Sequence, residues 1–496
     1  MENNLNLKQI TGGISVLSAV FGLSLLFIGS KVTFSLFAVI WLLILLCLFI
    51  AVYRQREQLF RTIMYILIAS TFLNQSILSV HVGFFTLFLY RLILVGCIAI
   101  FIIDLLKQRS LADKWERIEV KGVLFFLLFW LTYGFISLLW AKSITDGIKY
   151  LFLLGIGIAF VFLSVFAFTK IKHLLLFYYI WLGMTVVLLC LGLINHFAHV
   201  QLPSSTLYGG SAYKLGYPTA VFTNQNDFAT FLTISFFFYL AVVKNSKSIS
   251  MKIASIILAV LSIYIIYLTE SRASLLAIMI GLVAYVWLLL PSTWKKITGI
   301  AGAALVLIGM IAISSPLLHK VHDMYMLAGQ YSSTERLPSN LIRFNLLLST
   351  FHYIAQSYGF GVGAGNIPYY LEHESIYNTN QIYEVHNWLA EIMGNFGIFM
   401  VFGYITMYAY LFFSIYRMYQ EKRNRIHNML LEGCMVAMIA FIVSSISPSS
   451  VSNLYFHWVF LGFVTVTVSV LRNIENSVQE NQLLFYRRKE FWKQLL

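Results

Sequence analysis

The sequence predicts an all-α polytopic integral membrane protein with about 12–14 transmembrane helices. Of its 496 residues, 59% are hydrophobic and 11% are charged, whereas a soluble domain has about 25% charged residues. Apolar runs of about 20 residues, each long enough to span a bilayer, recur from one end of the chain to the other. The runs are continuous and do not alternate, so a β-barrel is excluded. The composition also excludes a soluble globule and a disordered chain.

The apolar runs define about fourteen expected spans, or twelve to thirteen if two of the tight connections are not true turns. All seven prolines lie at the ends of the runs or between them, so no span is expected to be broken by a proline. The expected spans cover residues 12–29, 32–52, 62–80, 84–103, 121–140, 147–168, 174–196, 219–243, 252–269, 273–290, 296–314, 389–416, 428–446 and 454–472.

The distribution of charge predicts the orientation of these spans. With the N-terminus inside, 25 of the 34 lysines and arginines fall in cytoplasmic segments and 8 in outer segments, as the positive-inside rule requires. We therefore expect both termini to be cytoplasmic. The net charge of +14 is explained by this topology and by contact with anionic membrane lipid, so it does not indicate a nucleic-acid partner.

We expect a single transmembrane domain over residues 1–496, with a long extracytoplasmic loop at 315–387 and a basic cytoplasmic tail at 473–496. A loop of this length usually carries function. Most of the histidines also fall on the outer side of the expected topology. Together these features indicate an extracytoplasmic working face.

The long loop contains a predicted amphipathic helix. Polar residues recur there at helical spacing, namely Arg336, Asn340, Arg343 and Thr350. An opposing apolar stripe consists of Phe344, Leu347, Leu348, Phe351 and Ala355. This pattern predicts a helix that lies on the membrane or caps a cavity.

Two arginines on the outer side are candidates for an anion site. Arg272 ends the segment Thr269-Glu270-Ser271-Arg272, which joins two spans with almost no loop, and Arg343 lies on the predicted amphipathic helix. Arg272 could be a snorkelling anchor, or it could bind an anion among the lipid headgroups. The planar fork of arginine suits phosphate because it donates two parallel hydrogen bonds.

Two further polar clusters lie where outer loops enter spans. The first, Asn224-Gln225-Asn226-Asp227, could cap a helix or bind sugar hydroxyls. The second contains His386 and Asn387. Alone, His386 would be an interface residue, but near two arginines it becomes a candidate general base or acceptor-orienting group. The chain has no residues at metal-ligand spacing, so we expect no metal.

The order of these motifs resembles that of the O-antigen ligase and polymerase superfamily of polytopic membrane glycosyltransferases. In that pattern, N-x-N opens a span and T-x-S-R follows at an outer junction. A long outer loop with an arginine and G-x-G-x-G-N then precedes H-N at the start of the next span. The corresponding residues here are Asn224 to Asn226, Thr269 to Arg272, Arg343, Gly361 to Asn366, and His386-Asn387. The resemblance covers residues 200–400.

Two positions depart from the pattern. The ligase motif H-[NSQ]-x9-G-x-x-[GTY] is matched by His386, Asn387 and Gly397, but its last position is Met400. Many members also carry an arginine just before the Pro-Thr that precedes N-x-N. Tyr217 stands there in this sequence, and Lys214 could take over that phosphate contact. Both departures favour the polymerase branch over the ligase branch.

The resemblance implies a glycosyltransferase that acts on undecaprenyl-diphosphate-linked oligosaccharide at the outer face of the bacterial cytoplasmic membrane, without a cofactor or metal. It implies that Arg272 and Arg343 bind the diphosphate and that His386 orients or deprotonates the acceptor. The substrate-binding residues that it implies are Lys214, Asn224, Asn226, Ser271 and Asn387.

Several functions remain open at this point. A polymerase would join repeat units into a surface polysaccharide such as teichuronic acid, an exopolysaccharide or O-antigen, whereas a ligase would transfer a finished glycan to another acceptor. A lipid-linked glycan flippase and a non-enzymatic scaffold of a wall-assembly complex are the alternatives from other classes. The implied partners are the lipid-linked oligosaccharide and membrane lipid, and other polysaccharide-assembly proteins could join them.

Overall fold

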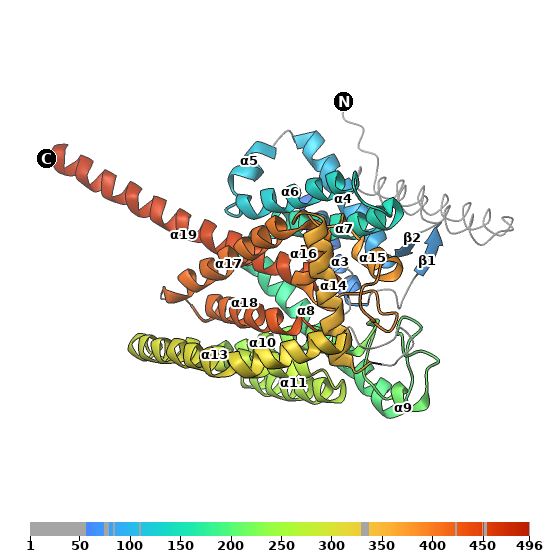
Figure 1. Cartoon of the computed structure of the whole chain (residues 1–496). Helices are drawn as coiled ribbons and strands as arrows, with labels where there is room; N and C mark the ends of the chain where they lie inside the picture. The colour runs from blue at the N-terminus through green and yellow to red at the C-terminus, as the bar shows by residue number, and fades with distance from the viewer. Residues whose placement is uncertain are drawn as a thin grey trace. The chain divides into compact units, whose positions relative to one another are not determined.

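The computed structural model describes residues 56–73, 79–82, 85–108, 111–328, 337–421, 424–448, 450 and 454–495. The expected spans at 12–29 and 32–52 lie outside the described residues. The chain groups into two compact units that meet in the sequence between Trp115 and Glu116 (Figure 1).

The described part of the first unit contains two long helices, a short hairpin and most of the short helix α5 (Leu111–Glu116). Helix α3 (Arg56–Thr71) packs against α4 (Leu89–Gln108). Strands β1 (Ser79–Val82) and β2 (Phe85–Phe88) pair antiparallel between them in sequence. Helix α3 therefore ends before the predicted limit of residue 80. The β-branched and aromatic residues of 79–88 favour an extended chain over another helical turn.

The second unit is a bundle of long apolar helices, which confirms the predicted polytopic helical class. It begins with a shorter apolar helix, α6 (Lys121–Ser137), which follows α5 in the sequence. Eight helices of the described chain are long and apolar enough to cross a membrane. They are α7 (Ile144–Ala167), α8 (Ile171–Ala198), α10 (Gln225–Asn245), α11 (Ile249–Leu268), α12 (Arg272–Leu289), α17 (Ile398–Gln420), α18 (Arg425–Ser444) and α19 (Tyr455–Leu495), the last with its spanning part at Tyr455–Ser477.

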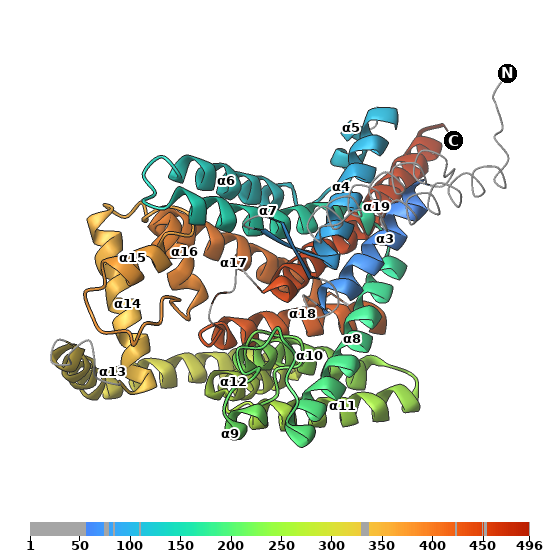
Figure 2. The same cartoon turned by 90° about the vertical axis from the view of Figure 1, so that its right-hand side faces the viewer.

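Helix α10 lies at the centre of this bundle. It packs against α11 on one side and α18 on another, while α12 packs against α18 and α7 packs against α19 (Figure 2). Most of α10 is buried, whereas α11 and α12 leave apolar side chains such as Val260 and Val283 exposed. A helix that is apolar all round is buried inside a membrane protein, and apolar surface at the rim of the bundle suits contact with lipid tails.

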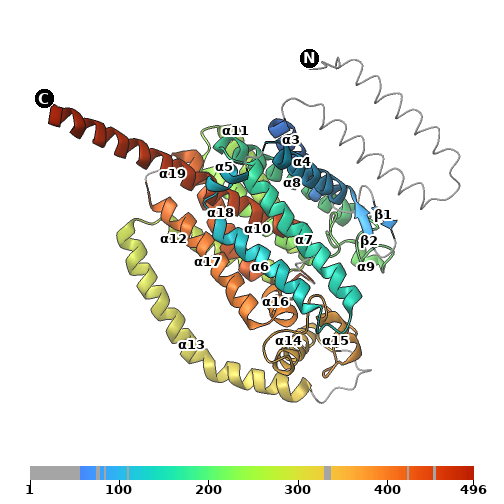
Figure 3. The ribbon, with the colours of Figure 1, turned by 90° about the horizontal axis from the view of Figure 1, so that it is seen from above.

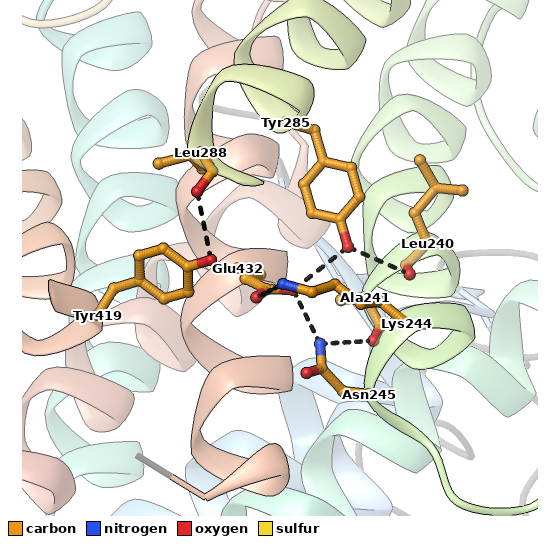
Figure 4. Close-up of polar contacts among 8 residues, drawn as sticks. All are labelled: Leu240, Ala241, Lys244, Asn245, Tyr285, Leu288, Tyr419 and Glu432. Atoms are coloured by element: carbon orange, nitrogen blue, oxygen red, sulfur yellow. Dashed lines mark hydrogen bonds and ion pairs between the residues drawn. The ribbon is translucent and has the colours of Figure 1, made fainter. Parts of the chain in front are cut away.

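A buried polar network ties four of these helices together (Figure 4). Glu432 of α18 is fully buried, and its carboxylate forms an ion pair with Lys244 of α10. The same carboxylate accepts hydrogen bonds from Asn245 at 2.8 Å and from the Tyr285 hydroxyl of α12 at 3.2 Å. Beside the carboxylate, the Tyr419 hydroxyl of α17 donates to the carbonyl oxygen of Leu288 in α12 at 3.5 Å. A buried carboxylate needs such partners, because removing a charge from water is unfavourable.

The span predicted at 389–416 is broken into two helices, and that prediction was wrong in this respect. Helix α16 (Trp388–Phe396) ends at Gly397, and α17 begins at Ile398. Gly397 has φ +85°, and a Cβ there would lie 2.2 Å from the carbonyl oxygen of Gly359. The glycine is therefore required both by its backbone conformation and by the close approach of the 359–361 segment.

The helix predicted at 296–314 is longer than expected. Helix α13 (Ser292–Ala328) continues to residue 328 and contains Pro316 in its interior, beyond the predicted span. It packs on α12 and α14 and runs along the margin of the unit (Figure 3). Pro316 lacks a donor N–H but does not terminate the helix here.

The predicted amphipathic helix exists as α14 (Ser339–Gln356), but it buries a different face. Leu341, Leu346 and Tyr353 are buried in a cluster with residues of α15 (Ile367–His373), whereas Phe351 of the predicted apolar stripe is 55% exposed. The buried face also includes polar side chains such as Asn345, which donates to the carbonyl of Asn378 at 2.7 Å. Tertiary hydrogen bonds therefore set the orientation of α14, and a pattern based on hydrophobicity could not reveal them.

Candidate functional site

A polar cleft of about 360 Å³ lies among the ends of three helices and brings predicted site residues together. Arg272 comes from the first turn of α12, Arg343 from α14 and Asn226 from the first turn of α10. Glu270 and Ser447 complete the part of the lining that bears on the chemistry. Residues more than 200 positions apart in the sequence therefore meet at one site.

The tight turn between α11 and α12 places Arg272 in the cleft. Glu270 has φ +57°, which lets the chain reverse within a few residues. The Thr269 hydroxyl donates to the carbonyl of Ile266 at 2.6 Å and accepts from the Ser271 N–H at 3.3 Å. The Ser271 side chain is 1% exposed. Its hydroxyl lies 3.1 Å from that of Ser274, so Ser271 supports the turn from behind the cleft.

Neither arginine of the cleft has an ion-pair partner among the described residues. Arg272 is exposed, whereas Arg343 is partly buried, and this burial lowers the pKa of its guanidinium. A partly buried cation without a carboxylate partner is poised to gain from an anionic ligand. Two such forks facing one cleft make it suited to a phosphate-bearing group.

Tyr217 lies near the Glu270 carboxylate, which lines the same cleft. Burial and the negative charge of that carboxylate raise the pKa of the Tyr217 hydroxyl. Lys214, on the short helix α9 (Ala212–Leu215), is exposed and lies outside the cleft lining, with its ammonium 5.7 Å from the centroid of the Tyr213 ring. Tyr217 therefore bears on the cleft through its proximity to Glu270, whereas Lys214 does not line it.

Asn224 and Asn387 are helix caps in this structure. The Asn224 side-chain oxygen accepts from the backbone N–H of Asn226 at 2.9 Å and of Asp227 at 3.0 Å. The Asn387 side-chain oxygen accepts from the N–H of Ala390 at 3.1 Å. Caps of this kind fix where a helix begins. Asn224 thereby directs Asn226 into the cleft, and Asn387 fixes the start of α16 directly after His386.

His386 lies at the edge of the cleft. Its Nδ1 is 3.4 Å from the carbonyl oxygen of Ser447, a residue that lines the cleft. Because a carbonyl can only accept a hydrogen bond, this contact assigns the proton to Nδ1 and leaves a lone pair on Nε2. The backbone of His386 has φ +55°, an uncommon conformation that directs the ring towards the turn containing Ser447.

The surroundings of His386 keep its ring neutral. Burial is the main cause that lowers its pKa, and the positive charge of Arg343 lowers it further. The charge of Glu384 and hydrogen bonds to the carbonyls of Ser447 and Pro448 act in the opposite direction. The net result is a pKa below the usual value, so the ring can accept a proton at neutral pH.

The sequence analysis did not identify Ser447. It lies just beyond α18 in a serine-rich segment, residues 444–450, and that segment, on the side predicted to be extracytoplasmic, was the available signal. Among the described residues, no group of three or more His, Cys, Asp or Glu side chains is arranged to hold a metal ion.

Comparison with known proteins finds a matching family and a similar protein. Residues 257–405 match the family described as O-antigen ligase, and this segment includes Arg272, Arg343 and His386. The chain is also 46% identical over 465 residues to the teichuronic acid biosynthesis protein TuaE of Bacillus subtilis (strain 168). That alignment covers 92% of this chain and 95% of the relative.

Proposed function

The chain belongs to the O-antigen ligase family of surface-polysaccharide assembly, and from this premise we propose that it polymerises lipid-diphosphate-linked oligosaccharide repeat units. The observation that carries the proposal is a pair of arginines, Arg272 and Arg343, that lie in one polar cleft beside a neutral histidine and have no ion-pair partner in the described part of the chain. The cleft offers a place for the diphosphate that leaves, and His386 offers a place for the proton of the acceptor hydroxyl.

In the proposed reaction, an acceptor hydroxyl attacks the anomeric carbon of the donor glycan. The bond between that carbon and the phosphate oxygen breaks, and the electron pair leaves with the lipid diphosphate. Arg272 and Arg343 stabilise the charge that the diphosphate gains, each by about 2–4 kcal/mol in the transition state. The hydroxyl proton passes to Nε2 of His386, whose Nδ1–H is held by Ser447.

The choice of polymerase over ligase depends on Tyr217 and on the similar protein. Met400, the other departure from the ligase motif, is 2% exposed and does not line the cleft, so it changes packing and has no direct contact with the reacting groups. Tyr217 lies near Glu270, which lines the cleft. The similar protein is named for biosynthesis of teichuronic acid, and a chain built from repeat units requires a polymerase.

Reconstitution tests the proposal. The purified protein in liposomes receives a synthetic lipid-diphosphate repeat unit, and the products are resolved by chain length. We expect chains longer than one added unit. Transfer only to an acceptor that is not a repeat unit would establish a ligase instead. Absence of any new glycosidic bond, while labelled lipid crosses the bilayer, would favour a flippase.

A further inference from the structure

A second cavity, of about 250 Å³, borders the segment that leads into His386. Glu384 and Val385 line it, and Ser450 lines it from the turn that also carries Ser447. Glu391 of α16 and Tyr150 of α7 contribute to its wall. The segment 384–386, together with Ser447 and Ser450, therefore adjoins the arginine-lined cleft and this second cavity.

The second cavity combines apolar walls with charged side chains whose balance is negative. Glu391 is 7% exposed, and its carboxylate accepts hydrogen bonds from the Tyr150 hydroxyl at 3.1 Å and the Ser450 hydroxyl at 2.8 Å. The Lys149 ammonium lies 3.2 Å from a carboxylate oxygen of Asp146, and the two charges offset each other. Glu384 adds a further carboxylate. The arginine-lined cleft favours anions, whereas this cavity disfavours them.

We propose that the second cavity binds the terminal sugar of the acceptor and selects an uncharged ring. This inference rests on the proposed glycosyl transfer. The volume suits a small ligand, since pockets for drug-sized molecules are about 300–1,000 Å³. Carboxylates accept hydrogen bonds from sugar hydroxyls, and the rings of Tyr150 and Tyr383 supply flat apolar surface beside them. A uronic acid would meet Glu384 and Glu391 with like charge.

His386 stands between the two cavities. It directly follows Glu384 and Val385, which line the second cavity. Its ring is hydrogen-bonded to the carbonyl of Ser447, which lines the arginine-lined cleft. The charges of Glu384 and Arg343, one from each cavity, both act on its ring. An acceptor hydroxyl from one side and an anomeric carbon from the other would thus meet at the histidine.

The test compares two synthetic lipid-diphosphate repeat units that differ only in the terminal sugar, which is an N-acetylhexosamine in one and a hexuronic acid in the other. We expect the wild-type protein to use the uronic acid acceptor at least tenfold less efficiently. Glu384→Gln and Glu391→Gln should reduce the difference in efficiency between the neutral and the uronic acid acceptor. Both should also raise the KM for the neutral acceptor. The matched control is Glu372→Gln, an exposed carboxylate outside both cavities.

A binding measurement separates this inference from the proposed function. Saturation-transfer NMR on the protein in nanodiscs, with the corresponding free oligosaccharides, needs no turnover. If the neutral oligosaccharide binds and Glu391→Gln weakens that binding, the result supports a sugar-binding role for the second cavity. This holds even if no transfer is observed and the proposed function is wrong. Equal binding of both oligosaccharides, or a ratio unchanged in both cavity variants, would overturn the inference.

Discussion

Arg272 and Arg343 are held differently, and this difference determines what substitution can reveal. Arg272 begins a helix and is exposed, so its side chain can be changed without opening the core. Arg343 is partly buried on α14, and its replacement would also disturb packing. Arg272 is therefore the cleaner probe of the diphosphate cleft.

We expect Arg272→Ala to lower the transfer rate by about 10²–10³-fold, because one charge-assisted contact to the leaving group is lost. Arg272→Lys should remain impaired, since an ammonium does not reproduce the bidentate fork. The measurement is polymer formation in liposomes at matched protein amount. Lys320→Ala, which removes an exposed cation of α13 outside the cleft, is the control and should retain wild-type activity. Wild-type polymer from Arg272→Ala would refute the assignment.

A base role for His386 predicts a specific pH profile. The neutral ring is active, so activity falls as pH drops through its pKa. Because burial and Arg343 lower that pKa, we expect the midpoint of the acid limb below 6.5, the ordinary histidine value. Glu384 raises the pKa, so Glu384→Gln should move the midpoint to still lower pH.

His386→Gln separates the two roles of the histidine. A lost base lowers the turnover rate and leaves the binding of the lipid-linked donor intact. If glutamine supports the wild-type rate with an unchanged acid limb, His386 only orients the acceptor, and Glu270 or Glu391 becomes the next base to test.

The sequence predicted some residues of the cleft and missed others for a physical reason. Arg272, Arg343 and Asn226 were predicted because each is a polar residue at the end of an apolar run or in the predicted outer loop, where it is conspicuous, and the three line one cleft. The proximity of Tyr217 to Glu270, and the contact of His386 with Ser447, join segments far apart in the chain. Only the folded arrangement reveals such contacts.

At the scale of helices, the ion pair in the buried network is asymmetric. The Glu432 side chain is 0% exposed, whereas the Lys244 side chain is 38% exposed. Removing Lys244 strands a buried carboxylate, while removing the charge of Glu432 leaves a lysine that can extend towards water.

We therefore expect Lys244→Ala to destabilise the bundle by about 3–5 kcal/mol, and Glu432→Gln to do so much less, because glutamine can still accept from Asn245 and Tyr285. Thermal denaturation in detergent, followed by size-exclusion fluorescence, measures both. The double variant should recover part of the loss caused by Lys244→Ala. Equal destabilisation by the two single changes would contradict this account.

Gly397 allows the break between α16 and α17, and we expect Gly397→Ala to disrupt it. A Cβ there would lie 2.2 Å from the carbonyl oxygen of Gly359, and the alanine would have to adopt φ +85°. The loss of folding free energy should therefore well exceed the roughly 1 kcal/mol of an ordinary glycine substitution. Gly183→Ala in α8 is the control, because no atom outside its own helix lies within 4 Å of the added Cβ. Yield of folded protein and polymer formation would both fall in the first variant and persist in the second.

The helices were more predictable than the breaks within them. Long apolar runs identify spans because the bilayer requires them. The break at Gly397 lies inside such a run, since Ile398 and Phe399 continue its apolar character. Gly397 was the signal in the sequence for this break. An isolated glycine is tolerated within helical patterns, so the sequence alone predicted one continuous span.

For the whole molecule, the orientation in the membrane decides whether the cleft can meet an outer-leaflet substrate. The 25-to-8 division of lysine and arginine predicts that the segment containing α14, α15 and His386 is extracytoplasmic and that the connection between α17 and α18 is cytoplasmic. Ser375 and Asn424 are exposed positions on these two segments.

A cysteine at Ser375 should therefore react with an impermeant maleimide in intact cells, and a cysteine at Asn424 should react only after permeabilisation. The background needs replacement of Cys47, Cys97, Cys190 and Cys434, and activity of that background shows that the fold is retained. Labelling of the Asn424 position alone in intact cells would invert the topology. It would then place Arg272, Arg343 and His386 on the cytoplasmic side, where an outer-face polymerase could not use them.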